Sequence, residues 1–366
     1  MSKLIVEVVK ILEVQKHSGA DRLDLLKVKG WQVISNKLPD GSSRYKVGDL
    51  VIYIPPDAVL TSELAEKLEV TNYCSIVKNP ITGGIKGYKV KGIRLRGEPS
   101  YGLLMANEGY SEGDDVAETF GITKWEPPPS HSEDGAPLHP LFHKYSDPEH
   151  YQNYPDAIPD GTRVVITEKI HGRNGRAGMI LVDGKWELMA GSHNFPRKEF
   201  GIQTGDRSIY WAGVTEQTKK LFDDVILGKT NLPQPQSSII LFHEIYGLGM
   251  QDMHYGRDSI SFAVFDIAID GNYVTWDQAD RILNEYGIPS VPVLFVGEHS
   301  STIVKTLTDG PTLMCDASIA GTFKGREGVV VKPYDTELVH PRWRWRVILK
   351  SVSADYLARK GGTDGH

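Results

Sequence analysis

The length, composition and charge of the chain limit the classes of protein to which it can belong. The sequence has 366 residues, of which 40% are hydrophobic, and this favours two domains of ordinary size with proper cores. The formal net charge is −6, which argues against non-specific coating of nucleic acid but leaves a local basic groove open. The two cysteines, Cys74 and Cys315, have no metal-site or disulfide-framework spacing, which favours a reducing compartment.

The sequence shows no pattern for export or membrane insertion. The first residues form an alternating strand-like run with charges inside it, unlike the apolar stretch of a signal peptide. No apolar segment is long enough for a membrane span. We therefore expect a soluble cytoplasmic protein, or a nuclear or organellar one in a eukaryote, and because no dimerisation motif is visible we expect a monomer.

The patterns in residues 1–125 are mostly those of β-strands. Apolar and polar residues alternate over 4–9, 20–35, 45–54 and 88–105, with glycine turns in between. The helix candidates in this half are residues 62–70 and 114–122. Short strands with glycine turns and few helices predict a small closed barrel.

One stretch of this half interleaves basic and aromatic residues. Its members are Lys86, Tyr88, Lys89, Lys91, Arg94, Arg96 and Tyr101. A basic face that carries aromatic side chains can bind nucleic acid. Alternating lysine and arginine also mark the solvated face of any strand, so both interpretations remain open.

The second half begins after residues 126–140, where prolines, serines, acids and histidines without apolar periodicity predict a linker. Beyond it, strand-like runs cover 161–170, 177–191, 238–247, 259–274 and 327–334, and amphipathic helix patterns cover 215–227 and 275–288. We predict an α+β domain of antiparallel sheets with flanking helices over 141–358, and a disordered tail over 359–366.

A lysine at the end of a strand pattern is the main chemical candidate. Lys169 follows a β-branched run and precedes a glycine turn at Gly172. A neutral lysine amine can attack the α-phosphorus of a nucleoside triphosphate, provided that nearby cations or partial burial lower its pKa. Such a site also needs further cations and a metal ion held by carboxylates. The alternative is a solvated lysine at a strand end.

Candidates for these partners follow in order, each at the edge of a strand pattern. They are Glu244 in FHEIYG, Phe265 and Asp266 in FAVFDI, Glu327 and Lys332 in EGVVVKP, and Lys350 in RVILKS. A single K-x-x-G tetrad is a weak signal because it is common by chance. The lysine motif and these four groups together make five elements in a fixed order, which is a strong signal.

This order of motifs resembles the covalent nucleotidyltransferases, the superfamily of ATP-dependent DNA ligases, RNA ligases and mRNA capping guanylyltransferases. The segment KIHGRN, residues 169–174, is similar to the lysine motif of RNA ligases that seal 3′-OH/5′-phosphate breaks. The N-terminal half resembles an OB-fold, and an OB-fold placed before the catalytic domain resembles the nick-sealing RNA ligases of the Deinococcus and Naegleria type. The resemblance covers residues 1–358.

The resemblance implies an N-terminal OB-fold over 1–125 and a nucleotidyltransferase domain after the linker. It also implies ATP, Mg²⁺ or Mn²⁺ and RNA as cofactors and partner, with AMP attached covalently to Lys169. The implied catalytic residues are Lys169, His171 and Lys350; the implied nucleotide-binding residues are Glu168, Lys169, Asn174, Arg197, Glu244, Phe265, Val330, Lys332 and Lys350; and the implied metal-binding residues are Glu327, Glu244 and Asn174. In this scheme His171 serves the later steps on the RNA end, and Phe265 stacks on adenine with Val329 or Val330 on its other face.

Several alternatives remain open. His171 can be a structural turn residue, and Phe265 can belong to the core. Relatives often have K-x-K in the last motif, whereas this chain has Ile348 and Lys350, so the group that replaces the missing cation is undetermined. Residues 340–347 alternate arginine and tryptophan, and on one strand the arginines would share a face.

Three alternative functions are left by the sequence. A DNA ligase or a capping-type guanylyltransferase would use the same motifs. A non-catalytic tRNA- or RNA-binding OB protein would bind RNA without needing Lys169.

Overall fold

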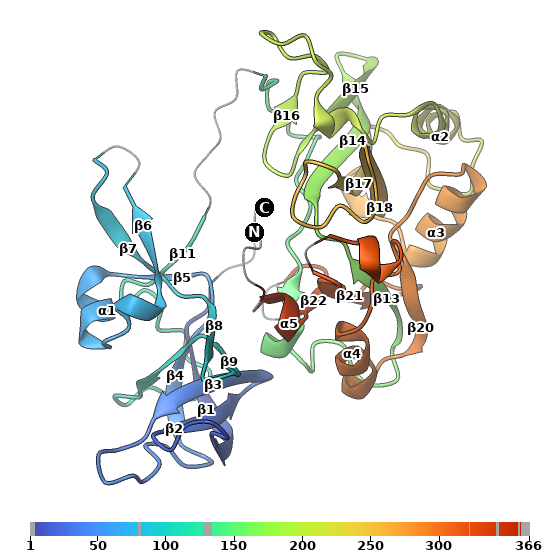
Figure 1. Cartoon of the computed structure of the whole chain (residues 1–366). Coiled ribbons are helices and arrows are strands. Elements are labelled where there is room, and N and C mark those ends of the chain that lie inside the picture. Colours follow the sequence, from blue (N-terminus) through green and yellow to red (C-terminus); the bar gives the residue numbers. More distant parts are fainter. Residues whose placement is uncertain are drawn as a thin grey trace. The chain divides into compact units, whose positions relative to one another are not determined.

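The computed structural model of the chain describes residues 4–79, 82–126, 134–321, 323–341, 344–357 and 359. Two compact units are present, and Figure 1 traces both by colour. The first unit contains residues up to 129 together with 150–155, and the second contains 130–149 and the chain from 156 onward. Of the predicted linker, 127–133 lie outside the described residues, as do 360–366 of the predicted tail.

The first unit consists of short antiparallel strands. One sheet has the order β10-β4-β1-β2-β3, another the order β11-β5-β7-β6, and β8 pairs with β9. The strands are β1 (Glu7–Lys16), β2 (Leu23–Val28), β3 (Trp31–Asn36), β4 (Leu50–Ile54), β5 (Ala58–Leu60), β6 (Ser75–Lys78), β7 (Ile85–Lys89), β8 (Gly92–Leu95), β9 (Glu98–Tyr101), β10 (Leu103–Ala106) and β11 (Thr123–Lys124). Alternate apolar residues such as Val6, Val8, Ile52 and Ile54 meet in one core, as the period of two predicts.

The two helix predictions in this unit had different outcomes. Residues 62–67 form α1 (Ser62–Lys67), whose N-cap Thr61 accepts a hydrogen bond from the Leu64 amide. The helix predicted over 114–122 is wrong, because the segment forms turns that are tied to the start of β1. There the Asp115 carboxylate accepts from the Val6 amide at 3.1 Å, and the Val116 amide donates to the Val6 carbonyl at 2.8 Å.

The basic and aromatic stretch of the first unit is divided between packed and exposed side chains. Tyr101 is buried, and its ring centroid lies 5.3 Å from that of Trp31. The amine of Lys89 lies 2.9 Å from the Asp57 carboxylate and 3.7 Å from the centre of the Trp125 ring. The exposed members are Lys86, Lys91, Arg94 and Arg96. Nucleic-acid binding by these four residues stays a prediction.

The second unit is built on two antiparallel sheets with the orders β12-β22-β21-β13-β20 and β16-β15-β14-β17-β18-β19. The strands are β12 (Glu149–His150), β13 (Arg163–Lys169), β14 (Arg173–Val182), β15 (Lys185–Ser192), β16 (Pro196–Arg197), β17 (Ser238–Gly247), β18 (Ile260–Ile269), β19 (Asn272–Tyr273), β20 (Val293–Glu298), β21 (Gly328–Pro333) and β22 (Leu349–Val352). The predicted strand runs of this half are therefore confirmed.

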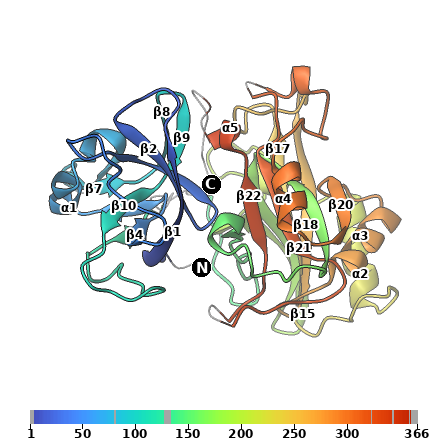
Figure 2. The ribbon, with the colours of Figure 1, turned by 90° about the horizontal axis from the view of Figure 1, so that it is seen from below.

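In the described part of this unit, four α-helices accompany the sheets: α2 (Glu216–Ile226), α3 (Trp276–Glu285), α4 (Ser301–Thr308) and α5 (Ala354–Leu357). The predicted helices at 215–227 and 275–288 are confirmed, and both begin with capping boxes, at Thr215 and Thr275. Apolar residues of α2 and α3 pack with those of β17 and β18 in the largest core, on one side of that sheet (Figure 1). Helix α4 packs on β21 and β22 (Figure 2).

The opposite face of β17 packs in a separate core with Phe142, Tyr145 and Ile348. Among the described residues, none of the helices has the length and apolar character that crossing a membrane requires.

Candidate active site

Lys169 lies at the end of β13, next to a carboxylate. Its side chain is 20% exposed, and its amine lies 2.6 Å from the Glu327 Oε1 atom, whereas the Glu327 side chain is only 5% exposed. The register explains this contact, because Lys169 pairs with Gly328, the residue after Glu327. A Cβ atom at Gly328 would lie 2.1 Å from the Ser351 carbonyl oxygen, so glycine is needed where β21 meets β22.

The strand register decides which predicted residues share a face with Lys169. Thr167 pairs with Val330, Val330 pairs with Lys350, and Val165 pairs with Lys332. Because side chains alternate between the two faces of a strand, the predicted residues on the lysine face are Val330, Lys332 and Lys350. Val329 is fully buried on the other face.

Glu168 points to the face opposite Lys169. Its buried carboxylate accepts hydrogen bonds from the Thr312 hydroxyl and from the Leu313 amide, the latter at 2.7 Å. Burial raises the pKa of Glu168, although the hydrogen bond from Thr312 opposes this. The structure therefore does not bring the Glu168 side chain to the face that carries the predicted nucleophile.

The second sheet contributes Asn174 and Glu244, which are paired across β14 and β17. The turn at Gly172 lies so close to β17 that a Cβ atom there would be 2.3 Å from the Ile245 carbonyl oxygen. Burial raises the pKa of Glu244 to about 8, with Lys169 opposing the shift and Glu327 adding to it. Two carboxylates from different sheets therefore interact with the same lysine.

Two oxygen atoms of this site are suited to a metal ion. Glu327 Oε2 and Asn174 Oδ1 are buried and have no hydrogen-bond partner among the described residues. Mg²⁺ prefers oxygen ligands and keeps several of its own waters. In the described part of the chain, no three or more histidine, cysteine, aspartate or glutamate side chains are grouped closely enough to hold a metal ion.

Lys332 is part of a buried network of charges. Its amine lies 3.1 Å from Asp266 Oδ2 and donates to the Phe265 carbonyl oxygen at 2.7 Å. Asp266 also accepts from Arg346 at 2.6 Å and from the Tyr145 hydroxyl at 2.8 Å. Burial lowers the pKa of Lys332 to about 8, while Asp266 opposes the shift. Arg346 thus places a cation beside Lys332, whereas Ile348 is buried in the core.

Phe265 occupies a β-bulge. Phe242 pairs with Asp266 and His243 pairs with Val264, so Phe265 is the extra residue between them. Its side chain is half-buried, with its ring centroid 4.8 Å from that of Tyr145, and like Val330 it lies at the edge of the core formed with Phe142. Stacking on adenine stays a prediction for this pair.

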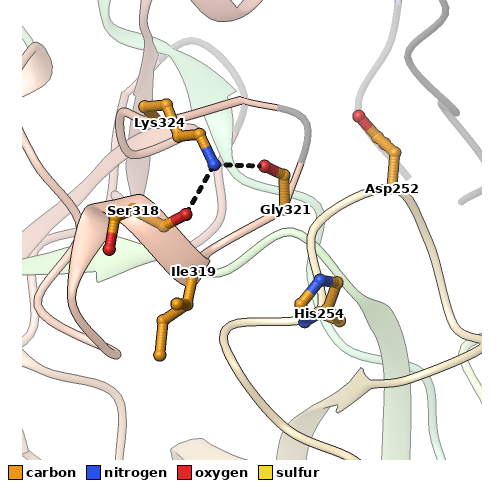
Figure 3. Close-up of a pocket in the computed structure, with 6 residues that line it drawn as sticks. All are labelled: Asp252, His254, Ser318, Ile319, Gly321 and Lys324. Carbon is orange, nitrogen blue, oxygen red and sulfur yellow. Dashed lines mark hydrogen bonds between the residues drawn. The ribbon is translucent and has the colours of Figure 1, made fainter.

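His171 is held by residues that no sequence motif indicated. Its Nε2 atom lies 2.7 Å from Asp252 Oδ1, and its Nδ1 atom lies 2.6 Å from the Tyr356 hydroxyl. Burial lowers the pKa of His171, and the nearby Glu327 and Asp252 oppose this shift. A pocket of about 310 Å³ borders Asp252, and in it the Lys324 amine donates to the carbonyls of Ser318 and Gly321 (Figure 3).

Two other predictions concern more distant residues. Arg197 is buried on the edge strand β16, two strands away from β14, with its guanidinium 5.6 Å from the centre of the Tyr210 ring. The condition that 340–347 form one strand, under which the arginines would share a face, is not met by the described residues of this segment. Arg344 has a φ of +58°, and the His340 amide donates to the Trp345 carbonyl at 3.1 Å. Arg342 and Trp343 lie outside the described residues.

Two family models match the chain, one in each of its halves. A family model for RNA ligase matches residues 162–352, more than half of the chain, and a model for an OB-fold domain matches residues 5–107. No curated protein sequence gives a significant match.

Several solved structures of Naegleria gruberi RNA ligase are similar to the chain. An apo mutant has 22% identity and a TM-score of 0.72, and the match covers 97% of each chain. A mutant with ATP and Mn has 22% identity and a TM-score of 0.72, with 96% of this chain and 98% of that chain covered. The form with PPi has 23% identity and a TM-score of 0.72, with 98% of each chain covered.

The fold and the site define an OB-fold domain followed by a nucleotidyltransferase-type domain, which confirms the predicted α+β fold class. Within that class, the chain belongs to the RNA ligase family. The predictions of the family and of an RNA-joining enzyme are therefore confirmed.

Proposed function

We propose that this RNA ligase uses ATP to seal 3′-OH and 5′-phosphate RNA ends, at nicks in duplexes, through a lysyl-AMP on Lys169. The observation that carries the proposal is the partly exposed Lys169 amine, 2.6 Å from Glu327 and on the same sheet face as Val330 and Lys350. Similar structures of the Naegleria gruberi enzyme contain ATP and Mn or AMP and Mn, which supports ATP and a divalent metal ion here.

The first step joins the lysine to AMP. The Lys169 nitrogen attacks the α-phosphorus, the new N–P bond forms, and the bond to the pyrophosphate breaks. The amine must lose a proton, and the Glu327 carboxylate at 2.6 Å is within reach of it. Lys350 would stabilise the charge that develops on the α-phosphoryl oxygens.

The later steps use the RNA ends. A 5′-phosphate oxygen attacks the phosphorus of lysyl-AMP, which breaks the N–P bond and leaves AMP on the RNA end. The 3′-hydroxyl then attacks the RNA phosphorus, the phosphodiester bond forms and AMP leaves. A bound Mg²⁺ or Mn²⁺, held by Glu327, Asn174 and Glu244, would neutralise phosphate charge.

Labelling with nucleotide tests the first step. The protein is incubated with ATP labelled at the α-phosphate and with Mg²⁺ or Mn²⁺, and we expect a covalent label on the wild type. Lys169→Ala should take no label, whereas Lys185→Ala, which changes an exposed lysine on β15, should label like the wild type. An unlabelled wild type, or equal label on Lys169→Ala, would refute the proposal.

Competing substrates distinguish the alternatives. We expect labelling with ATP but not with GTP, which separates the proposed enzyme from a capping-type guanylyltransferase. Faster sealing of a nick with RNA ends than of a nicked DNA duplex separates it from a DNA ligase. A non-catalytic RNA-binding protein would bind RNA equally well with Lys169→Ala and would seal neither substrate.

A further inference from the structure

Four buried side chains form a closed cycle around the histidine of the lysine motif. His171 Nε2 lies 2.7 Å from Asp252 Oδ1, and Asp252 Oδ2 lies 3.2 Å from Arg359 Nε. The Arg359 guanidinium stacks 3.5 Å from the centre of the Tyr356 ring and donates to the Tyr356 carbonyl at 2.9 Å. The Tyr356 hydroxyl closes the cycle at His171 Nδ1, at 2.6 Å.

The cycle selects one tautomer of the imidazole. A carboxylate only accepts hydrogen bonds, so the nitrogen that faces Asp252 must carry a proton. Burial disfavours a charged imidazole, since the His171 side chain is only 4% exposed. The other nitrogen, Nδ1, therefore accepts the proton of the Tyr356 hydroxyl, and both nitrogens of a neutral ring are satisfied.

This arrangement also bears on Glu327. Its Oε2 atom lies 3.8 Å from His171 Nδ1, the nitrogen that Tyr356 already occupies. In the other tautomer Nδ1 would carry a proton, and it could not accept a hydrogen bond from Tyr356. With Tyr356 in place, the buried Oε2 atom has no hydrogen-bond partner among the described residues and stays available to a ligand.

The segment that carries Tyr356 is attached to the site through its backbone. The Ser353 amide donates to the Glu327 carbonyl at 2.9 Å, and the Leu357 amide donates to the Ser353 carbonyl at 3.0 Å. Helix α5 therefore begins directly after a residue, Ser353, whose backbone is bonded to that of Glu327. Asp252 comes from a different segment, after β17, so only the folded chain assembles the cycle.

We propose that Tyr356 and Arg359 are positioning residues for the joining of RNA ends, because they hold His171 in one orientation and as the Nε2–H tautomer. This inference rests on the proposed function of the site. Residues after the last lysine-bearing strand then belong to the functional unit of the enzyme, although no motif marks them.

The main test removes one hydroxyl group. Tyr356→Phe is compared with Tyr286→Phe, which removes a similar hydroxyl that donates to Asp224 at 2.9 Å on the surface of α2. Two rates are measured: self-labelling with ATP, and sealing of a nick whose 5′ end already carries AMP. We expect the ratio of sealing to self-labelling to fall roughly tenfold in Tyr356→Phe, as loss of one buried hydrogen bond implies, and to stay at the wild-type value in Tyr286→Phe.

Nitrogen NMR of ¹⁵N-histidine protein, without nucleotide and with a metal chelator, provides a second readout. The His171 signals are assigned by their loss in His171→Gln. We expect a proton on Nε2 and an accepting Nδ1 in the wild type, and a shifted Nδ1 signal in Tyr356→Phe. A loss of stability alone would not produce this selective shift, and thermal melting checks that each variant is folded.

The outcomes separate the two proposals. A proton on Nδ1 in the wild type, or an unchanged ratio in Tyr356→Phe, overturns the inference while the ligase assignment stands. If the wild type takes no label, the proposed function fails, and the NMR arm still decides the tautomer. If Tyr356→Phe does not fold, Arg359→Lys takes its place, with a roughly fivefold fall in the same ratio expected from the lost fork geometry.

Discussion

The buried carboxylate of Asp266 offers a sharp test of the electrostatics of the second unit. Asp266 is fully buried and contacts Arg346 at 2.6 Å, Lys332 at 3.1 Å and the Tyr145 hydroxyl at 2.8 Å. Asp266→Asn keeps the shape of the side chain but removes the charge between two buried cations. Glu337 remains 3.1 Å from Arg346 and offsets part of this loss.

The expected magnitude follows from these contacts. Removing one partner of a buried ion pair costs about 3–5 kcal/mol of unfolding free energy. Because Glu337 still neutralises Arg346, we expect the lower end, about 3 kcal/mol. For a unit of this size, that corresponds to a fall in Tm of roughly 6–12 °C.

Urea and thermal unfolding at neutral pH, followed by circular dichroism, measure this cost. Asp335→Asn is the matched control, because its pair with Arg163 is exposed and 3.5 Å long, and it should cost less than about 0.5 kcal/mol. The double variant Asp266→Asn, Lys332→Met should recover part of the loss, since one unpaired cation is gone. A cost below about 1 kcal/mol for Asp266→Asn would show that the network does not carry the stability we assign to it.

Three further predictions concern the site. Between pH 4.5 and about pH 8, folded Glu244 binds more protons than the same residue in the unfolded chain, so the free energy of unfolding should fall with rising pH, by at most about 1.4 kcal/mol per pH unit. Glu244→Gln should remove this slope in urea titrations with a chelator. Equal slopes in the wild type and the variant would contradict the assignment. Gly172→Ala should lower the free energy of unfolding by about 2 kcal/mol and block self-labelling, because its Cβ atom would lie 2.3 Å from the Ile245 carbonyl oxygen. The control Gly84→Ala should behave like the wild type, because no atom lies closer than 3.6 Å to the added Cβ atom. Lys350→Ala should slow self-labelling roughly 100-fold, with partial recovery in Lys350→Arg, and an unchanged rate would remove Lys350 from the phosphate site.

The order of the motifs along the chain was enough to predict part of the site. The spacing of Lys169 and Glu327 within strand patterns was enough to expect them near each other, and their atoms lie 2.6 Å apart. Strand alternation could also have placed Glu168 on the opposite face, because it directly precedes Lys169. The choice between Val329 and Val330 required the register of β13, β21 and β22, which the sequence does not show.

Other residues of the site were not indicated by any pattern in the sequence. Asp252 follows β17 in an irregular segment, and Tyr356 and Arg359 lie in and after a four-residue helix. Asp266 was noted only as part of a motif and Arg346 only as part of the alternating segment 340–347, whereas Tyr145 was not noted. The helix expected over 114–122 failed for a related reason: hydrogen bonds to Val6, more than 100 residues earlier, replaced those of a helix.

The sequence by itself determined most of the longer strands, the two capped helices of the second unit and the order of the reactive residues, because alternation and capping depend on neighbours along the chain. The tertiary structure alone decided which face each side chain takes, which charges are buried together and what holds His171. These properties depend on register and burial between segments far apart in the chain, where a shift of one residue would exchange the two faces of a strand.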